Sequence, residues 1–379
     1  WSKSMQVGFE KTLVFLVFIL LGILLKAKFK SPNEVNGLKK IILNLALPAT
    51  IFIALLGMEV KTNLLVLPLV ALAINLVLFA ATPLVLPLVG VQKNTASYRT
   101  ARLLLPSLAP GLSCFPFVLE FLGEGYLAKA AMADLGNKVF VLIVLYLVAM
   151  RWYYARNRET NTGSSAKVIS LFKTLVTEPV NLFIVLALLL LFLGYSMDSL
   201  PFVIRDTLSK LSLLMTPLVL LFIGLAIKIK RTQFFQIFSL LALRAGIVFL
   251  LVAVCVSWAW EPLHEDLLLM LSFGLSACSF WPFAHLSLVD GLEVEKKTRT
   301  FNSSYAIGIL ALSFPFSTVL ILGVLNSGSL FQSNGNIWVT TLLLFAIGTA
   351  YPLLNLMARK ARNIRLEGPK LESTKPEQA

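Results

Sequence analysis

Apolar runs of membrane-crossing length alternate with short polar segments along almost the whole chain. About 20 apolar residues in a helix cross the roughly 30 Å hydrocarbon core of a bilayer. Such runs are found at 8–26, 38–57, 63–90, 101–122, 126–150, 179–197, 208–228, 235–259, 266–288, 300–325 and 337–358. The pattern predicts an all-α membrane protein with about eleven transmembrane helices.

The composition agrees with a chain whose outer surface is solvated by lipid. Hydrophobic residues make up 58% of the 379 residues and charged residues 14%, whereas a soluble domain has about 25% charged residues. The first apolar run is long enough to span, so we predict no cleavable signal peptide. Cys114, Cys255 and Cys278 lie inside apolar segments, so we predict neither a disulfide framework nor a metal site.

The net charge of +14 would suit a nucleic-acid partner, but the positive side chains gather between the apolar runs. Of 33 Lys and Arg residues, 25 lie in one alternating set of connections together with the C-terminal tail, and six lie in the other set together with the N-terminus. The first set is therefore cytoplasmic by the positive-inside rule. We predict a protein of the plasma (cell inner) membrane, with its N-terminus outside, its C-terminus in the cytoplasm and no nucleic-acid partner.

Marker residues of the first half recur in the second half, 165 to 172 positions later. The matched pairs are Gly22 and Gly194, Pro48 and Pro217, Pro116 and Pro282, and Asn137 and Asn302. Five helices per half is an odd number, so the halves enter the membrane from opposite sides, as in many secondary transporters. The predicted organisation is a first repeat over 1–150, a cytoplasmic linker over 151–178, a second, inverted repeat over 179–326, an extra helix over 337–358 and a cytoplasmic tail over 359–379.

Prolines interrupt the fourth and ninth predicted helices. The fourth contains Pro106, Pro110 and Pro116, with Gly111 among them, and the ninth contains Gly274 and Pro282. A proline inside a helix removes a backbone hydrogen bond and costs about 3 kcal/mol or more. Broken helices at matching positions of two repeats point to a transport site, although prolines can also simply kink continuous helices.

A broken helix frees main-chain groups for a ligand, because half-helix amides can hold an anion and carbonyls a cation. We predict a substrate site near these breaks. Its predicted residues are Pro110, Gly111, Ser113, Cys114, Pro116, Asn137, Ser276, Cys278, Ser279, Pro282 and Asn302.

Charged residues inside apolar runs are the second signal. Asp134 and Lys138 are four positions apart on one helical face and can pair. Asp134 is predicted to be a proton-coupling carboxylate, with Lys138 in place of a bound cation, or else both form a structural ion pair. His285 is predicted to shuttle protons or to be a hydrogen-bonded core residue. Arg244 could attract an anion, but we expect it to extend to the membrane interface.

Several segments resemble the auxin efflux carrier family, within the bile-acid/arsenite/auxin transporter-like inverted-repeat superfamily. They are LKKIILNLALPATIF (38–52), EPVNLFIVLALLLLFLGYS (178–196), LLMTPLVLLFIGLAIK (213–228), and Gly111 with FPFVLEFLGEGYLAKAAMADLGN (115–137). The resemblance covers residues 10 to about 325. It implies ten helices in two inverted five-helix repeats, with helices four and nine broken at prolines and crossing near the substrate. It also implies transport of small organic anions without ATP.

The leading hypothesis is a secondary transporter of small organic anions such as carboxylates, driven by protons or by the membrane potential and without a cofactor. One alternative is a sodium-coupled symporter of the bile-acid carrier type, and another is a ligand-binding membrane sensor. We predict no enzyme, because HExxH and GxSxG are missing, and no ATP-driven pump, because a GxxxxGK[ST] loop is missing. The expected partners are the substrate and the lipid bilayer, and a homodimer is left open.

Overall fold

The structure is a computed structural model and describes residues 3–29, 31–57, 66–156, 177, 179–226, 233–258, 262–293 and 299–366. Every regular element in these ranges is a helix, so the all-α prediction is confirmed for them. Most of the predicted linker 151–178 and residues 367–379 of the predicted tail lie outside the described residues.

The first half of the chain forms helices separated by short turns. They are α1 (Lys3–Leu25), α2 (Pro32–Ile41), the π-helical turn η1 (Ile42–Ala46), α3 (Leu47–Leu56), α4 (Leu67–Leu88), α5 (Ala96–Leu104), α6 (Pro110–Ser113), α7 (Phe115–Leu122), α8 (Glu124–Val139), the π-helical turn η3 (Phe140–Val144) and α9 (Leu145–Arg156). Three successive helices, α2, η1 and α3, continue one another, and so do α8, η3 and α9.

The second half is built in the same way. Its helices are α11 (Pro179–Phe192), the 3-10 turn η4 (Met197–Ser199), α12 (Phe202–Leu213), α13 (Met215–Ala226), α14 (Phe234–Ser257), α15 (His264–Gly274), α16 (Trp281–Leu292), α17 (Ser303–Leu325), the 3-10 turn η6 (Leu330–Gln332) and α18 (Asn334–Leu366). The helix predicted over 337–358 lies within α18, which continues into the predicted tail.

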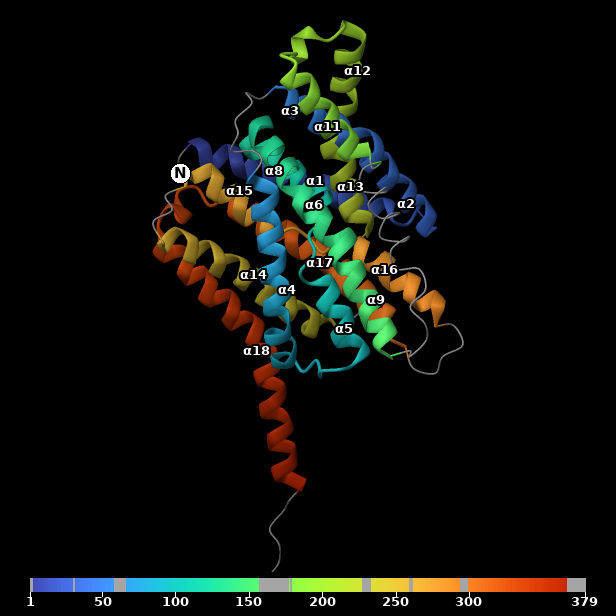
Figure 1. Cartoon of the computed structure of the whole chain (residues 1–379). Coiled ribbons are helices and arrows are strands. Elements are labelled where there is room, and N and C mark those ends of the chain that lie inside the picture. Colours follow the sequence, from blue (N-terminus) through green and yellow to red (C-terminus); the bar gives the residue numbers. More distant parts are fainter. Residues whose placement is uncertain are drawn as a thin grey trace, which may run out of the picture.

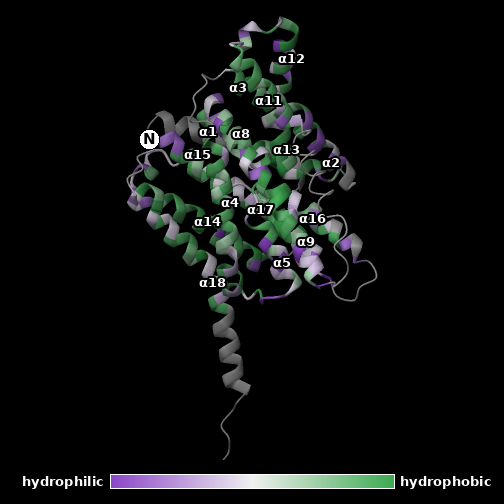
Figure 2. Cartoon of the chain, viewed as in Figure 1, coloured by the Kyte–Doolittle hydropathy of each residue, from purple (hydrophilic) through white to green (hydrophobic). Residues whose placement is uncertain are grey.

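Seven helical stretches among the described residues are long and apolar enough to cross a membrane. They are Glu34–Leu56, Leu67–Leu88, Glu124–Arg156, Phe202–Leu225, Phe234–Ser257, Ser303–Leu325 and Asn334–Leu354. Leu13–Leu25 and Pro179–Phe192 are shorter apolar helices, and the predicted spans 101–122 and 266–288 are interrupted. Apolar residues cover most of the helical body (Figure 2). The chain is an integral membrane protein, and the count of eleven spans stays a prediction.

Helices of the two predicted repeats pack against each other: α1 lies along α13, and α3 lies along α11 (Figure 1). Glycines allow the first contact to be close, because a Cβ on Gly22 would lie 3.0 Å from the Cα of Gly224. Small residues bring membrane helices together in this way. The exchange of partners between halves is what an inverted repeat would produce, and the repeat itself stays a prediction.

The longest helix, α18, packs along α14 and then continues past the body of the protein (Figure 1). Gly348 lets α18 approach Leu243 of α14, and the Phe345 ring lies against Gly246. As a result α14 is buried along most of its length, and its Arg244 side chain reaches the two interrupted spans.

Candidate functional site

The fourth predicted span is interrupted in the interior of the protein. α5 ends at Leu104 and α6 begins at Pro110, and the main chain between them is not helical. Pro106 lies in this gap and has no N–H to donate, whereas Pro110 stands at the start of α6, where a missing N–H matters least. The carbonyl groups of this first gap therefore need partners from outside the helix.

The ninth predicted span has a corresponding gap. α15 ends at Gly274, and α16 begins at Trp281 with Pro282 in its first turn. Residues 275–279 of this second gap are buried and non-helical. The two interruptions that the prolines predict are thus confirmed.

The two gaps contact each other directly. The Ala109 N–H donates to the Ala277 carbonyl at 2.8 Å, and the Ala277 N–H donates to Ser113 Oγ at 2.9 Å. A further bond runs from the Ser279 N–H to Ser107 Oγ at 3.0 Å. Because each gap satisfies polar groups of the other, the two segments are fixed against each other where they cross.

Arg244 on α14 extends into this crossing. Its Nε donates to the Leu105 carbonyl at 2.6 Å, and one terminal nitrogen donates to the carbonyls of Ser107 at 3.3 Å and Ser276 at 2.8 Å. The residue is only 5% exposed, so the prediction that it extends to the membrane interface is wrong. A guanidinium carries several N–H donors in one plane, which lets Arg244 bind carbonyls of both gaps at once.

A cavity of about 500 Å³ lies beside the crossing, and this volume falls within the roughly 300–1,000 Å³ of small-molecule sites. Six of the predicted site residues line it, namely Pro110, Gly111, Asp134, Asn137, Lys138 and Ser279. The remaining lining residues are Lys39, Leu43, Asn44, Leu47, Leu108, Ala109, Leu112, Val141, Thr177, Pro179, Val180, Phe280, Trp281 and Ala284.

Asn137 on α8 fixes the first gap at the wall of the cavity. Its Nδ2 donates to the Leu108 carbonyl at 3.0 Å, and its Oδ1 accepts from the Leu108 N–H at 3.3 Å. Asn75 on α4 supports it, because Asn75 Nδ2 donates to Asn137 Oδ1 at 3.1 Å and to the Pro106 carbonyl at 2.8 Å. The amide therefore replaces hydrogen bonds that the interrupted helix lacks.

The predicted pairing of Asp134 with Lys138 is confirmed. Lys138 Nζ lies 3.7 Å from Asp134 Oδ2 and donates to Asn181 Oδ1 on α11 at 2.9 Å. The other carboxylate oxygen of Asp134 accepts from Asn137 Nδ2 at 2.8 Å. All four side chains are buried, so the ion pair is embedded in a polar network that includes the support of the first gap.

A second ammonium group, from a different part of the chain, also lines the cavity. Lys39, near the end of α2, places its Nζ 3.6 Å from the centroid of the Phe280 ring, which belongs to the second gap. This is a cation–π contact. The cavity thus has two ammonium groups and one carboxylate among its described lining residues.

Two π-helical turns border the cavity. η1 supplies Leu43 and Asn44, and η3 supplies Val141. Single π-helical turns inside long helices often occur at functional sites, since they shift the following side chains around the helix axis. The Val141 carbonyl accepts a hydrogen bond from His285 Nε2 at 2.9 Å, so η3 is also bonded to α16.

Several predicted site residues do not line the cavity but support the elements around it. Ser113 accepts from the second gap, and the Cys278 N–H donates to Ser313 Oγ at 3.2 Å. Cys114 separates α6 from α7, and Ser276 provides a carbonyl to Arg244. The first turns of α7 and α16 contain Pro116 and Pro282, respectively.

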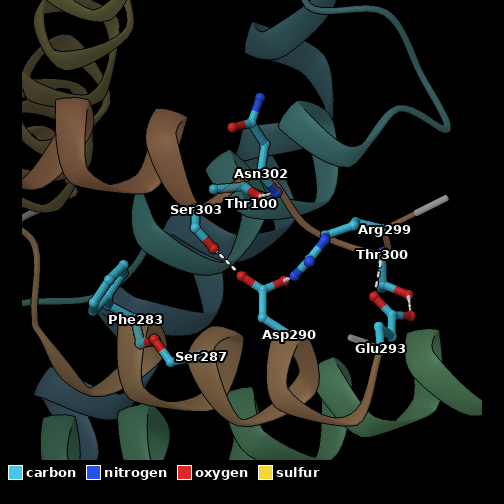
Figure 3. A network of polar contacts seen from close by, with 9 residues as sticks. All are labelled: Thr100, Phe283, Ser287, Asp290, Glu293, Arg299, Thr300, Asn302 and Ser303. Atoms are coloured by element: carbon cyan, nitrogen blue, oxygen red, sulfur yellow. Dashed lines mark hydrogen bonds and ion pairs between the residues drawn. The ribbon is translucent and has the colours of Figure 1, made fainter. Parts of the chain in front are cut away.

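Asn302 lies in a separate polar network at the start of α17 (Figure 3). Its side chain caps that helix by accepting from the Tyr305 N–H at 3.0 Å, and its own N–H donates to Thr100 Oγ1 on α5 at 2.9 Å. Nearby, the Asp290 carboxylate accepts from Ser303 and lies 3.9 Å from the Arg299 guanidinium. The network joins α16, α17 and α5 away from the lining of the cavity.

Lys39, Asn181 and Arg244 belong to the site but were not predicted in these roles. Lys39 is one of five lysines in a short cluster that is predicted to be cytoplasmic, so the sequence marks it only as a topology signal. Asn181 lies in the segment 178–196, but its partner Lys138 is 43 positions away. An interaction between residues so far apart in the chain cannot be predicted from the spacing of neighbouring residues.

No protein family model matches the chain. A protein described as an uncharacterized transporter from Methanocaldococcus jannaschii is 26% identical to the chain over 132 residues, which are 35% of this chain and 39% of that protein. The chain therefore matches well under half the length of this relative. The chain thus has helices of membrane-spanning length and a partial similarity to a transporter.

Proposed function

We propose that the protein is a secondary transporter of small organic anions, such as carboxylates, that works by alternating access. The observation that carries this proposal is the contact of two interrupted membrane segments beside one cavity. Interrupted helices near the bilayer midplane commonly form transporter substrate sites. The partial similarity to a transporter and the resemblance of several segments to the auxin efflux carrier family support it.

The charges and walls of the cavity favour an anion with an apolar body. Lys39 and Lys138 supply two positive charges against the one negative charge of Asp134. A small carboxylate could bind between the ammonium groups while its apolar part contacts Leu43, Val141 or other lining side chains. Burial strengthens such charge-assisted hydrogen bonds.

Asp134 is the proposed coupling group. Its carboxylate lies 3.7 Å from the Lys138 ammonium and offsets that charge, so protonation of Asp134 would increase the attraction of Lys138 for the substrate anion. This makes coupling to protons, or to the membrane potential, the simplest driving force. We place the protein in the plasma membrane with the N-terminus outside, because the clusters of positive residues favour that orientation.

The sodium-coupled alternative has a specific difficulty. Carbonyls freed by interrupted helices are the groups that could coordinate Na⁺, and Arg244 already binds three of them. A fixed guanidinium at this place would repel a second cation. We therefore expect transport that does not change when Na⁺ is replaced by K⁺ or choline.

The test begins with a thermal-shift screen of the purified protein against small mono- and dicarboxylates. Compounds that raise the Tm are then measured for uptake into proteoliposomes, with and without a pH gradient and a membrane potential. Lys39→Gln should raise KM about tenfold, the change expected for one lost charge-assisted hydrogen bond. Lys40→Gln is the matched control, because Lys40 is the next residue, is exposed and does not line the cavity.

Two results would reject the proposal. One is the lack of stabilisation and uptake for every carboxylate tested with folded protein. The other is equal KM for the Lys39→Gln and Lys40→Gln variants, which would remove the cavity from substrate binding. Uptake that requires Na⁺ would instead favour the sodium-coupled symporter.

A further inference from the structure

A second, smaller cavity of about 150 Å³ lies between α5 and the end of α9, at the ends of these helices that are predicted to face the cytoplasm. Arginine and aromatic side chains dominate its lining, which includes Tyr98, Arg99, Arg102, Trp152 and Arg156. We call it the arginine pocket. Its volume is about half the lower bound for sites that enclose a whole small molecule, so it suits a single anionic group.

Arg99 is a buried residue that lines the arginine pocket. It is 9% exposed, its Nε donates to the Thr300 carbonyl at 2.8 Å and its Nη1 donates to the Asn94 carbonyl at 2.8 Å. Both partners are neutral, so its charge is not cancelled by them. The Glu293 carboxylate attracts Arg99 but accepts from the Thr300 N–H at 2.8 Å and from Thr300 Oγ1 at 2.6 Å (Figure 3).

Arg102 is one turn further along α5, on the same face. Its guanidinium lies 4.8 Å from the centroid of the Phe79 ring and 5.6 Å from that of Trp152. Its Nε–H is buried and has no hydrogen-bond partner within the part of the chain that the structure describes. A buried N–H without a partner costs about 1–3 kcal/mol, so Arg102 has a donor available for a ligand.

Arg156 closes the pocket from the end of α9, where its side chain is exposed. Its positive charge repels that of Arg99. No described carboxylate forms an ion pair with Arg99, Arg102 or Arg156. Arg99, Arg102 and Arg156 line one small pocket, so their positive charges repel one another, and an anion between them reduces this repulsion.

We propose that Arg99, Arg102 and Arg156 form a binding site for a phosphate group, carried by an anionic phospholipid or by a soluble phosphate compound. Guanidinium groups match the oxygens of phosphate with paired hydrogen bonds. The position favours the lipid source, since basic pockets between membrane helices on the cytoplasmic side bind lipid headgroups. Trp152 and Tyr98 are also the residue types that prefer the membrane–water interface.

A bound phosphate would connect α5 to α9. Arg102 belongs to the half-helix that leads into the first gap, and Arg99 also bonds to the segment that precedes α17. The occupied site would thus hold the cytoplasmic end of the interrupted span in place. Binding itself does not depend on the proposed transport function and is measured without it.

The experiment measures the Tm of the full chain and the lipids that it retains in native mass spectrometry. One arm compares nanodiscs of phosphatidylcholine with nanodiscs that contain phosphatidylglycerol, and the other adds inorganic phosphate or glycerophosphate to protein in detergent. We expect wild type to retain phosphatidylglycerol and to gain Tm. Arg156→Gln should weaken binding about tenfold or more, as expected for one lost charge-assisted hydrogen bond.

Arg151→Gln is the matched control, because Arg151 is an exposed arginine on α9 that does not line the pocket. It removes the same charge and should bind lipid like wild type. Arg156 is exposed, so its substitution should leave the fold intact, and Arg102→Gln provides a second variant. Stabilisation by phosphate in detergent would support the soluble source, and stabilisation only in phosphatidylglycerol nanodiscs the lipid source. Equal binding by Arg156→Gln and Arg151→Gln, or no effect of either probe, would overturn the proposal.

Discussion

Arg244 donates hydrogen bonds to three main-chain carbonyls that belong to the two gaps. Among the described residues, it is the one charged side chain that donates hydrogen bonds to both gaps. Arg244→Ala should therefore destabilise the protein strongly, since each buried carbonyl left without a partner costs about 1–3 kcal/mol. Arg244→Lys should restore only part of the loss, because an ammonium group cannot reproduce the planar set of donors. The measurement is the Tm of the purified variants in one detergent.

Arg205→Ala is the appropriate control for these variants. Arg205 is 41% exposed and pairs with an exposed carboxylate, Asp198, at 3.0 Å, and exposed pairs contribute about 0–1 kcal/mol. A Tm of Arg244→Ala equal to that of Arg205→Ala would show that the crossing does not depend on the guanidinium.

Asp134→Asn tests the proposed coupling group. The amide keeps the size of the side chain and its contact with Asn137, so the protein should fold, but it cannot take up and release a proton. We expect proton-dependent uptake into proteoliposomes to be abolished. Asp206→Asn is the control, because Asp206 pairs with Lys210 in an exposed part of α12. Unchanged proton dependence in Asp134→Asn would remove Asp134 from the mechanism.

Sequence reasoning succeeded at this scale where partners are close in the chain. Asp134 and Lys138 are four positions apart, so their pairing follows from helix geometry. It failed for Arg244, whose partners Leu105 and Ser276 are 139 and 32 positions away. Its place in an apolar run suggested an extended side chain at the interface, because nothing local indicates that two non-helical segments lie beside it.

At the scale of helices, the contact between α1 and α13 gives a sharp prediction. A Cβ at Gly22 would collide with the main-chain carbonyl of Leu221, and backbone cannot move away as a flexible side chain can. Gly22→Ala should lower stability by about 1–3 kcal/mol, seen as a lower Tm. Gly125→Ala, where a Cβ meets no atom within 4 Å, should be neutral or stabilising because alanine favours helices. Equal Tm values for both variants would contradict this close contact.

The elements themselves were largely predictable. The spans 101–122 and 266–288 were expected to be broken because proline leaves a local and specific signal, and both contain a gap. The π-helical turns η1 and η3 were not expected, since they differ from α-helix by one residue per turn and the residues in them, ILNLA and FVLIV, suit either form. The positions of the lining residues in η1 and η3 therefore depend on π-helical turns, which leave no recognisable pattern in the sequence.

For the whole molecule, the orientation in the membrane can be measured with single cysteines in a Cys255→Ser background, since Cys255 is the exposed native cysteine. Asp198, with its side chain 93% exposed, lies in a connection predicted to be outside, and Lys93 lies in one predicted to be cytoplasmic. A membrane-impermeant maleimide should label Asp198→Cys in intact cells and label Lys93→Cys only after permeabilisation. The reverse result would invert the topology.

The membrane class of the whole molecule followed from composition and from the length of the apolar runs. The sequence carries a weaker signal for an internal repeat, because each matched marker is a single residue. The packing of α1 on α13 and of α3 on α11 supports an inverted repeat, but the number of spans and the repeat boundaries stay predictions.

The contact of α18 with α14 has a mechanical consequence. Because α14 packs along α18 and is bonded to both gaps through Arg244, we expect a tilt of α14 to move the two gaps and α18 with it. We therefore expect α14, α18 and the two gaps to move, or to stay still, as one rigid body. Any displacement that exposes the cavity to alternate sides would then occur at the boundary of this body and not inside it.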